Sequence, residues 1–243
     1  MGGFTDPGHL PNLRRDRRPR HPSWLPRQRR GTTPQMIGRY PDYDVLENAH
    51  NWDEATRRCV LARLEVPPLM RFFAAGEEPA LRAFCDVATG QDADPRVPVA
   101  EVVDHRLADG TLDGYQYAGM PDDREVWRIV LAGLDEIAQG RHRAGFHELA
   151  WDEREAIVGQ LAGGVVSGGA WERVDPGRAF KVCMRYVLGA FYSHPWAWNE
   201  IGFGGPAYPL GFMRLGGIGV LEPHERPGAT VEDPVRVARA MEP

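Results

Sequence analysis

Residues 122–140 read DDREVWRIVLAGLDEIAQG and form the longest stretch of regular hydrophobic spacing in the chain. The apolar residues recur three and four positions apart, as on one face of an α-helix; they are Val126, Trp127, Val130, Leu131, Leu134 and Ile137. Asp122, Asp123 and Glu125 stand at the start, where negative charge stabilises the positive end of a helix dipole. Paired carboxylates also invite an acid–base hypothesis. The simpler prediction is a long amphipathic helix with an acidic first turn.

Shorter stretches on both sides predict five further helices. Each begins with a capping, acidic or proline residue and ends at glycine or proline, and we expect them at residues 51–66, 77–88, 98–108, about 152–162 and 176–191. Asn51 is the predicted N-cap of the first. No stretch alternates between apolar and polar residues as a half-buried strand would. The sequence therefore predicts a mainly α fold, a compact domain of about six helices with an irregular C-terminal extension rich in glycine, proline and aromatic residues.

Composition and charge suggest three regions. The chain has 243 residues, 42% of them hydrophobic and 26% charged, which is enough for one domain with a real core. Eight arginines lie between residues 14 and 30 among prolines, so residues 1–39 are predicted to be a disordered basic arm. The helical domain is expected at residues 40–215 and an irregular tail at 216–243. The formal net charge of −5 gives the whole chain no basic surplus, which argues against nucleic acid as a partner.

Cysteine usage and hydropathy restrict the chemistry and the location of the chain. Cys59, Cys85 and Cys183 are far apart and each falls in an apolar helical pattern, so we expect buried, inert thiols and no iron–sulfur or zinc site. No run approaches the roughly 18 to 20 apolar residues of a membrane span. The arginine pairs of the arm lack the apolar segment that follows them in an export signal. Cytoplasmic residence is therefore expected, with export beside a signal-bearing partner left open.

Residues 192–212 read YSHPWAWNEIGFGGPAYPLGF and differ in composition from the predicted helices. Glycine permits close backbone approach, proline fixes φ, and large aromatic rings supply rigid contact area. This mixture suits a docking surface, although the same composition fits a loop that closes the protein's own core. We expect docking by residues 192–215, and the candidate interface residues are Trp196, Trp198, Asn199, Phe203, Tyr208 and Phe212.

Few residues suggest catalysis or metal binding. His194 is most open to a catalytic role, because imidazole titrates near neutral pH, and Asn199 and Glu200 lie near it in sequence. The structural alternative, which we favour, is that His194 caps the last turn of the preceding helix. His142 and His147, with Glu148, are the nearest approach to a metal site but are better explained as solvated loop residues. No G-x-G-x-x-G follows a strand, so no dinucleotide is expected in this chain.

Several stretches resemble one known family, in the same order as they occur there. Residues 192–212 closely resemble the C-terminal signature of the gluconate 2-dehydrogenase subunit 3 family. Residues 40–63, residues 72–86 with FF and LRAFCD, residues 97–106 (VPVAEVVDHR) and residues 113–121 (DGYQYAGMP) fit the same family. In the last of these, Tyr115 and Tyr117 could face a partner or tuck under the loop. The resemblance covers about residues 40–215.

The resemblance implies a non-catalytic small subunit that binds and stabilises a larger oxidoreductase. That partner is expected to be a FAD-dependent dehydrogenase of the glucose–methanol–choline type, acting on a sugar, polyol or glycoside. The flavin would then reside in the partner and no cofactor in this chain. Two alternatives remain at this point: a free-standing small enzyme that uses His194, and a binding module that acts through the basic arm.

Overall fold

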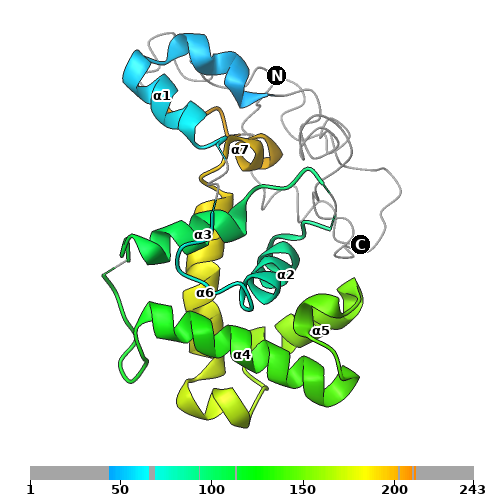
Figure 1. Cartoon of the computed structure of the whole chain (residues 1–243). Helices are drawn as coiled ribbons and strands as arrows, with labels where there is room; N and C mark the ends of the chain where they lie inside the picture. Colours follow the sequence, from blue (N-terminus) through cyan, green and yellow to red (C-terminus); the bar gives the residue numbers. More distant parts are fainter. Residues whose placement is uncertain are drawn as a thin grey trace, which may run out of the picture. The chain divides into compact units, whose positions relative to one another are not determined.

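The computed structural model describes residues 44–65, 69–92, 94–112, 114–201, 203–209 and 211. Across these residues the regular structure is helical and contains no strand, which confirms the mainly α prediction (Figure 1). The predicted arm, the predicted tail and Phe212 lie outside the described residues. The described residues form two compact units. The terminal unit contains residues 44–65, 94–97 and the described part of 193–211, and the central unit contains residues 69–92 and the described part of 98–192.

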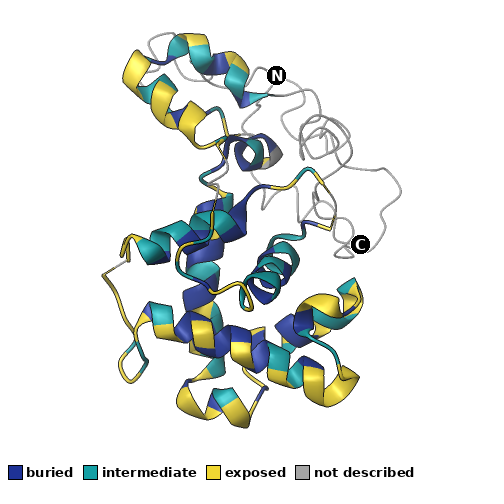
Figure 2. Cartoon of the chain, viewed as in Figure 1, coloured by how far each residue is buried: buried dark blue, intermediate teal, exposed yellow. Residues whose placement is uncertain are grey.

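The central unit consists of five α-helices and two short 3-10 helices. They are α2 (Glu78–Thr89), α3 (Val99–Ala108), α4 (Asp123–His142), η5 (Phe146–Glu148), α5 (Trp151–Ala162), η6 (Gly169–Arg173) and α6 (Pro176–Phe191). Helix α6 packs against α2, α3, α4 and α5, so it lies at the middle of this unit. Figure 2 shows buried residues along much of α6 and on one side of α4. The core of the unit therefore forms around α6.

Aromatic side chains supply much of this core. Trp127 and Tyr186 are fully buried, and their ring centroids lie 6.3 Å apart in an edge-to-face arrangement. Phe84 and Phe73 also present ring edges to Trp127, at centroid distances of 5.8 Å and 6.1 Å. Such pairs contribute roughly 0.5 to 1.5 kcal/mol each beyond the burial of their area. Trp127, from the stripe predicted in residues 122–140, thus connects α2, α4 and α6.

The helices predicted in the central unit are confirmed, and their ends agree to within two residues; α4 continues past Gly140 to His142. Asp122 caps α4, because its carboxylate accepts the backbone N–H groups of Arg124 and Glu125. Asp175 caps α6 in the same way through the N–H of Arg178, and α6 spans the predicted residues 176–191. Gly90 ends α2 in the left-handed conformation, with φ of 70°. Local capping chemistry therefore defines the start of α4, the start of α6 and the end of α2.

The terminal unit departs further from the predictions. It contains η4 (Val45–Asn51), α1 (Glu54–Ala62) and α7 (Pro195–Ile201). Asn51 is the last residue of η4 and not the cap of the next helix; Asp53 caps α1 by accepting the N–H of Thr56 at 2.8 Å. Helix α7 occupies part of the stretch for which no regular structure was expected. Pro195 both prevents continuation of α6 and starts α7 at a position that needs no N–H donor.

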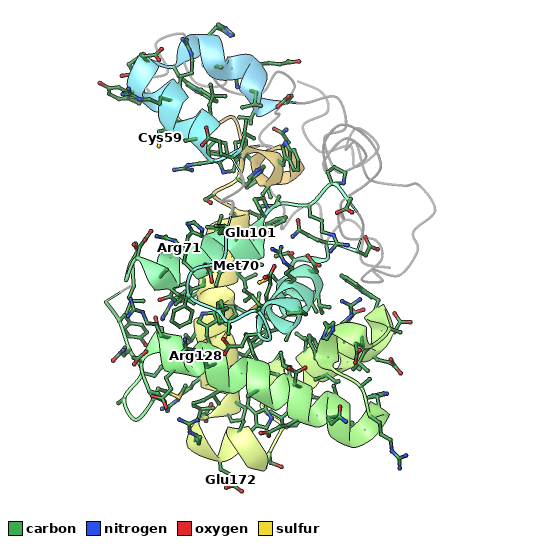
Figure 3. All side chains as sticks on the ribbon, viewed as in Figure 1. Cys59, Met70, Arg71, Glu101, Arg128 and Glu172 are labelled. Carbon is green, nitrogen blue, oxygen red and sulfur yellow. The ribbon has the colours of Figure 1, made fainter. Side chains whose placement is uncertain are left out.

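The cysteines divide into two environments. Cys85 and Cys183 are buried in the central unit, and burial raises the pKa of both thiols well above their usual range, as expected for inert core residues. Cys59 is exposed, so the prediction of a buried thiol is wrong at this position. The reason is that α1 buries only Val60, and the neighbouring Cys59 projects away from the helix (Figure 3). None of the helices formed by the described residues is both long and apolar enough to cross a membrane.

Candidate docking site

The terminal unit has a small hydrophobic core that uses both ends of the described chain. Its buried members are Val45, Trp52, Val60 and Trp198. Trp198 lies on α7 and is only 5% exposed. Val45 comes from η4 and Val60 from α1, and Trp52 lies between these two helices. The guanidinium of Arg63 lies 5.4 Å from the centroid of the Trp198 ring and donates to the carbonyl of Ser193. The tryptophan is thus a core residue of its own unit.

Amide side chains connect α7 to the N-terminal segment of the same unit. The Oδ1 atom of Asn199 accepts the backbone N–H of Val45 at 2.7 Å, and its Nδ2 lies 3.3 Å from Oδ1 of Asp44. Asn48 donates from Nδ2 to the carbonyl of Gly204 at 3.0 Å. Asn199 is fully buried, so these hydrogen bonds satisfy polar groups that would otherwise be costly inside the unit. They hold residues 203–207 beside η4.

Gly205 shows why glycine is needed in this segment. Its φ is +84°, a conformation that side chains with a Cβ rarely adopt. A Cβ there would also lie 2.8 Å from Cζ2 of Trp52 and 3.0 Å from Cγ2 of Val45. The backbone therefore lies directly against the core of the terminal unit.

The remaining aromatic residues of the segment are open to solvent. Phe203 is 42% exposed and Tyr208 is 64% exposed, and Ile201 at the end of α7 is 50% exposed. The Phe203 ring presents an edge to Trp198 at a centroid distance of 5.4 Å, so its position is fixed by the core. Trp196 is half-buried. Of the six candidate interface residues, the structure thus places Trp198 and Asn199 inside the terminal unit and leaves Trp196, Phe203 and Tyr208 accessible; Phe212 is outside the described residues.

His194 is a helix cap in the structure. It is 4% exposed, and its Nδ1 lies 3.2 Å from the backbone nitrogen of Trp196, which donates to it. Its carbonyl accepts the N–H groups of Ala197 and Trp198. Burial lowers the pKa of His194 to about 4, so the imidazole is neutral at pH 7. The prediction of a capping role is confirmed in kind but misplaced: His194 caps the start of α7 instead of the last turn of α6.

The other candidate residues do not converge on a site. His142 ends α4 and lies 3.2 Å from Glu153, whereas His147 is exposed on η5. No group of three or more His, Cys, Asp or Glu side chains among the described residues is arranged to hold a metal ion. Glu153 also accepts the N–H of Ala150 at the start of α5, so its carboxylate has a structural role at that helix end.

Among its described residues, the central unit contains two buried carboxylates, of which sequence reasoning missed Asp104 and placed Asp123 only in the acidic first turn of a helix. Asp104 is fully buried on α3 and accepts the backbone N–H groups of Arg71, Phe72 and Phe73 at 2.6 to 3.0 Å. Asp123 is 3% exposed and accepts the hydroxyl of Tyr186 at 2.6 Å. The sequence offers no local signal for either contact, because the partners lie more than 30 residues away.

A groove of about 960 Å³ lies along α4 and η6 in the central unit. Arg173 forms an ion pair with Glu125 inside it, and the Arg128 guanidinium lies 4.6 Å from the centroid of the Phe72 ring. Figure 3 labels Arg128 on α4. Glu136 accepts the N–H of Ala170 at 2.9 Å. These contacts hold η6 and the residues around Phe72 against α4. The polar side chains that make them therefore stabilise the packing of the central unit.

Comparison with known proteins identifies the family. Residues 75–205 match the family model described as gluconate 2-dehydrogenase subunit 3. The match covers more than half of the chain, and it includes all of α2 to α7 and Gly205. Searches of curated proteins and of solved structures give no match. The chain is a member of the gluconate 2-dehydrogenase subunit 3 family.

Proposed function

We propose that this chain is a non-catalytic small subunit that binds and stabilises a larger dehydrogenase. The partner would be a FAD-dependent oxidoreductase of the glucose–methanol–choline type that oxidises a sugar, a polyol or a glycoside. The observation that carries the proposal is the family match over residues 75–205. In this proposal the flavin is bound by the partner and oxidation occurs there.

The terminal unit offers a suitable surface for such a partner. Phe203 and Tyr208 are exposed, and Phe203 is held in place by its contact with buried Trp198. Rigid aromatic side chains make effective interface anchors because little conformational freedom is lost on binding. Trp198, Asn199 and Gly205 would support docking indirectly, by holding the segment against η4. Trp196, Phe203 and Tyr208 would make the contacts with the partner.

The geometry of His194 weighs against a free-standing enzyme that uses this residue as a general base. A general base needs an accessible nitrogen within reach of the proton that it removes. In His194 the Nδ1 atom already accepts a backbone N–H, and the ring is buried beside Trp196. A pKa of about 4 also makes the imidazole a weak base. These features suit a cap of α7 better than an acid–base catalyst.

The test is expression of the tagged chain together with a dehydrogenase encoded beside it, followed by purification and a visible spectrum. We expect a stoichiometric larger band and the absorbance of oxidised flavin between roughly 350 and 500 nm. The larger subunit expressed alone should be less soluble or less stable than in the complex. A colourless single chain that never retains a partner would contradict the proposal.

A further inference from the structure

The outer face of α6 in the central unit carries an unusual group of side chains. Arg178, Lys181, Arg185 and Leu188 follow one another three or four positions apart, so they share one face of the helix. We call these four residues the α6 face. Leu188 is 41% exposed, Arg178 and Lys181 are exposed, and Arg185 is half-buried. The sequence of α6 contains no acidic residue.

The loop before α4 extends the α6 face with two tyrosines. Arg178 lies 5.8 Å from the centroid of the Tyr117 ring, and Arg185 lies 5.4 Å from that of Tyr115. Arg178 also donates to the carbonyl of Ala118 at 3.1 Å. The two tyrosine rings meet edge to face at 5.3 Å, and Tyr115 remains 55% exposed. Of the two placements that the sequence left open for these tyrosines, the structure thus has Tyr115 facing outward.

The charge of the α6 face contrasts with that of the surrounding chain. Between residues 44 and 211 there are 26 acidic and 16 basic side chains, so this part of the chain is strongly acidic. Among the described residues, Asp175 caps α6 by accepting the backbone N–H of Arg178. Asp123 lies 3.3 Å from Arg185, but it is buried and also accepts the hydroxyl of Tyr186. Arg106, whose guanidinium lies 4.9 Å from the Tyr186 ring, adds a further cation nearby. Lys181 forms no ion pair with any described residue.

We propose that the α6 face, with Tyr115 and Tyr117, is a second docking surface, and that it binds an acidic patch on the larger dehydrogenase subunit. The inference rests on the proposed function. It adds that the central unit also contacts the larger subunit, through opposite charges. Complementary charge favours this occupant, because the acidic remainder of residues 44–211 would repel a negatively charged partner everywhere else. It also disfavours a nucleic acid, whose phosphates extend well beyond a patch of this size.

The structure also gives a reason for binding to be efficient at this surface. A guanidinium that stacks on a tyrosine ring is held in one orientation before a partner arrives. Arginine and tyrosine are enriched among the residues that contribute most to interfaces. Leu188 and the exposed side of Tyr115 supply apolar contact between the charges. An acidic partner surface would therefore meet fixed donors with little further ordering.

Lys181 makes the proposal directly testable, because it is the only lysine in the chain. A carbodiimide, which joins an amine to a carboxylate without a spacer, should link Lys181 in the purified complex to an Asp or Glu of the larger subunit. Peptide mass spectrometry then identifies both ends. In parallel, acetylation of the Lys181 amine by an activated ester should be much slower in the complex than in the free chain.

Charge reversal supplies a matched pair of variants. Lys181→Glu should weaken the complex about tenfold or more and reduce the dependence of affinity on salt. Arg141→Glu changes the net charge equally at an exposed position in the last turn of α4, and should leave the affinity almost unchanged. Both variants should retain the helical circular dichroism of the parent chain.

The outcomes separate the two proposals. If the complex forms but Lys181 stays unlinked and reacts as fast as in the free chain, the docking role of the α6 face is wrong while the proposed function stands. The same conclusion follows if Lys181→Glu binds as well as Arg141→Glu. If no complex forms at all, both proposals fall. If the chain instead retains nucleic acid through Lys181 and no dehydrogenase, the occupant of the α6 face is a phosphate backbone and the proposed acidic protein surface is wrong.

Discussion

The side-chain oxygen of Asn199 accepts the backbone N–H of Val45 at 2.7 Å, although the two residues are 154 positions apart. Val45 is fully buried, and so is Asn199. This hydrogen bond joins η4 to α7, and the one from Asn48 to Gly204 joins η4 to the segment that follows α7. The terminal unit is therefore closed by long-range contacts of amide side chains.

Replacement of Asn199 by alanine should destabilise the terminal unit. The variant leaves the N–H of Val45 buried without its acceptor, and an unsatisfied buried group costs about 1 to 3 kcal/mol. Urea unfolding followed by tryptophan fluorescence measures the change. Gln116→Ala removes an exposed amide from the central unit and should change the free energy of unfolding by less than about 0.5 kcal/mol. Equal stability of the two variants would argue against the role assigned to Asn199.

The stability of the terminal unit should depend on pH through His194. Burial lowers its folded-state pKa to about 4 from 6.5, so the folded state favours the neutral ring and the unfolded state binds the proton more readily. The stabilisation from the neutral ring is therefore fully present above pH 6.5 and is lost as the pH falls toward 4. The difference between these two pKa values corresponds to about 3 kcal/mol of stability.

His194→Asn provides the control for this pH dependence. Asparagine is a good N-cap and can still accept the N–H of Trp196, but it does not titrate. Urea unfolding at pH 7.5 and at pH 4.5 should therefore show a smaller loss of stability in the variant than in the parent chain. An identical loss in both chains would mean that other groups cause the pH dependence.

A close helix contact in the central unit should make Gly133 intolerant of alanine. A Cβ at this position would lie 2.9 Å from Nε1 of Trp171 and closer still to two carbons of the same ring. Trp171 is buried on η6, so Gly133→Ala should displace the ring and destabilise the unit by roughly 1 to 3 kcal/mol. Gly140 lies on the same helix with nothing near its absent Cβ, and Gly140→Ala should be neutral or slightly stabilising. Thermal melting compares the two variants.

The proposed docking site predicts different effects for its exposed and buried aromatic residues. Phe203→Ala combined with Tyr208→Ala should weaken partner binding by about 2 kcal/mol, or roughly 30-fold, with little change in the melting temperature of the chain. Trp198→Ala should instead lower the stability of the terminal unit by about 3 to 5 kcal/mol, because the ring belongs to the core. Calorimetric titration and thermal melting together distinguish the two effects. Unchanged binding by the exposed pair would refute their role as anchors.

Helices whose limits depend on local chemistry could be predicted from the sequence. The stripe around Trp127 and the carboxylate of Asp122 both lie within one short segment, and α4 begins where they indicate. The same is true of α6, which starts at a proline after Asp175. Amphipathic spacing and an N-cap are properties of neighbouring residues, so they are visible without a fold.

The interior of the terminal unit could not be predicted in this way. The composition of the segment around Trp198 suggested an anchor for a partner. Trp198 instead packs against Val45 and Trp52, which lie about 150 positions earlier in the chain. Cys59 shows the converse, since its apolar neighbours suggested burial but α1 buries only Val60. Tertiary contacts decided both positions. Phe203 and Tyr208 are exposed, so docking by this segment stays a prediction that the variants above test.

The hydrogen bond between Val45 and Asn199 also bears on where the chain can be shortened. The family match begins at residue 75, which excludes η4 and α1. A chain cut at that boundary would lose Val45, Trp52 and Val60, and would leave Trp198 and the amide of Asn199 without their packing partners. Such a fragment should be prone to self-association through the uncovered tryptophan, whereas a fragment that starts at residue 44 retains the complete hydrophobic cluster of the terminal unit.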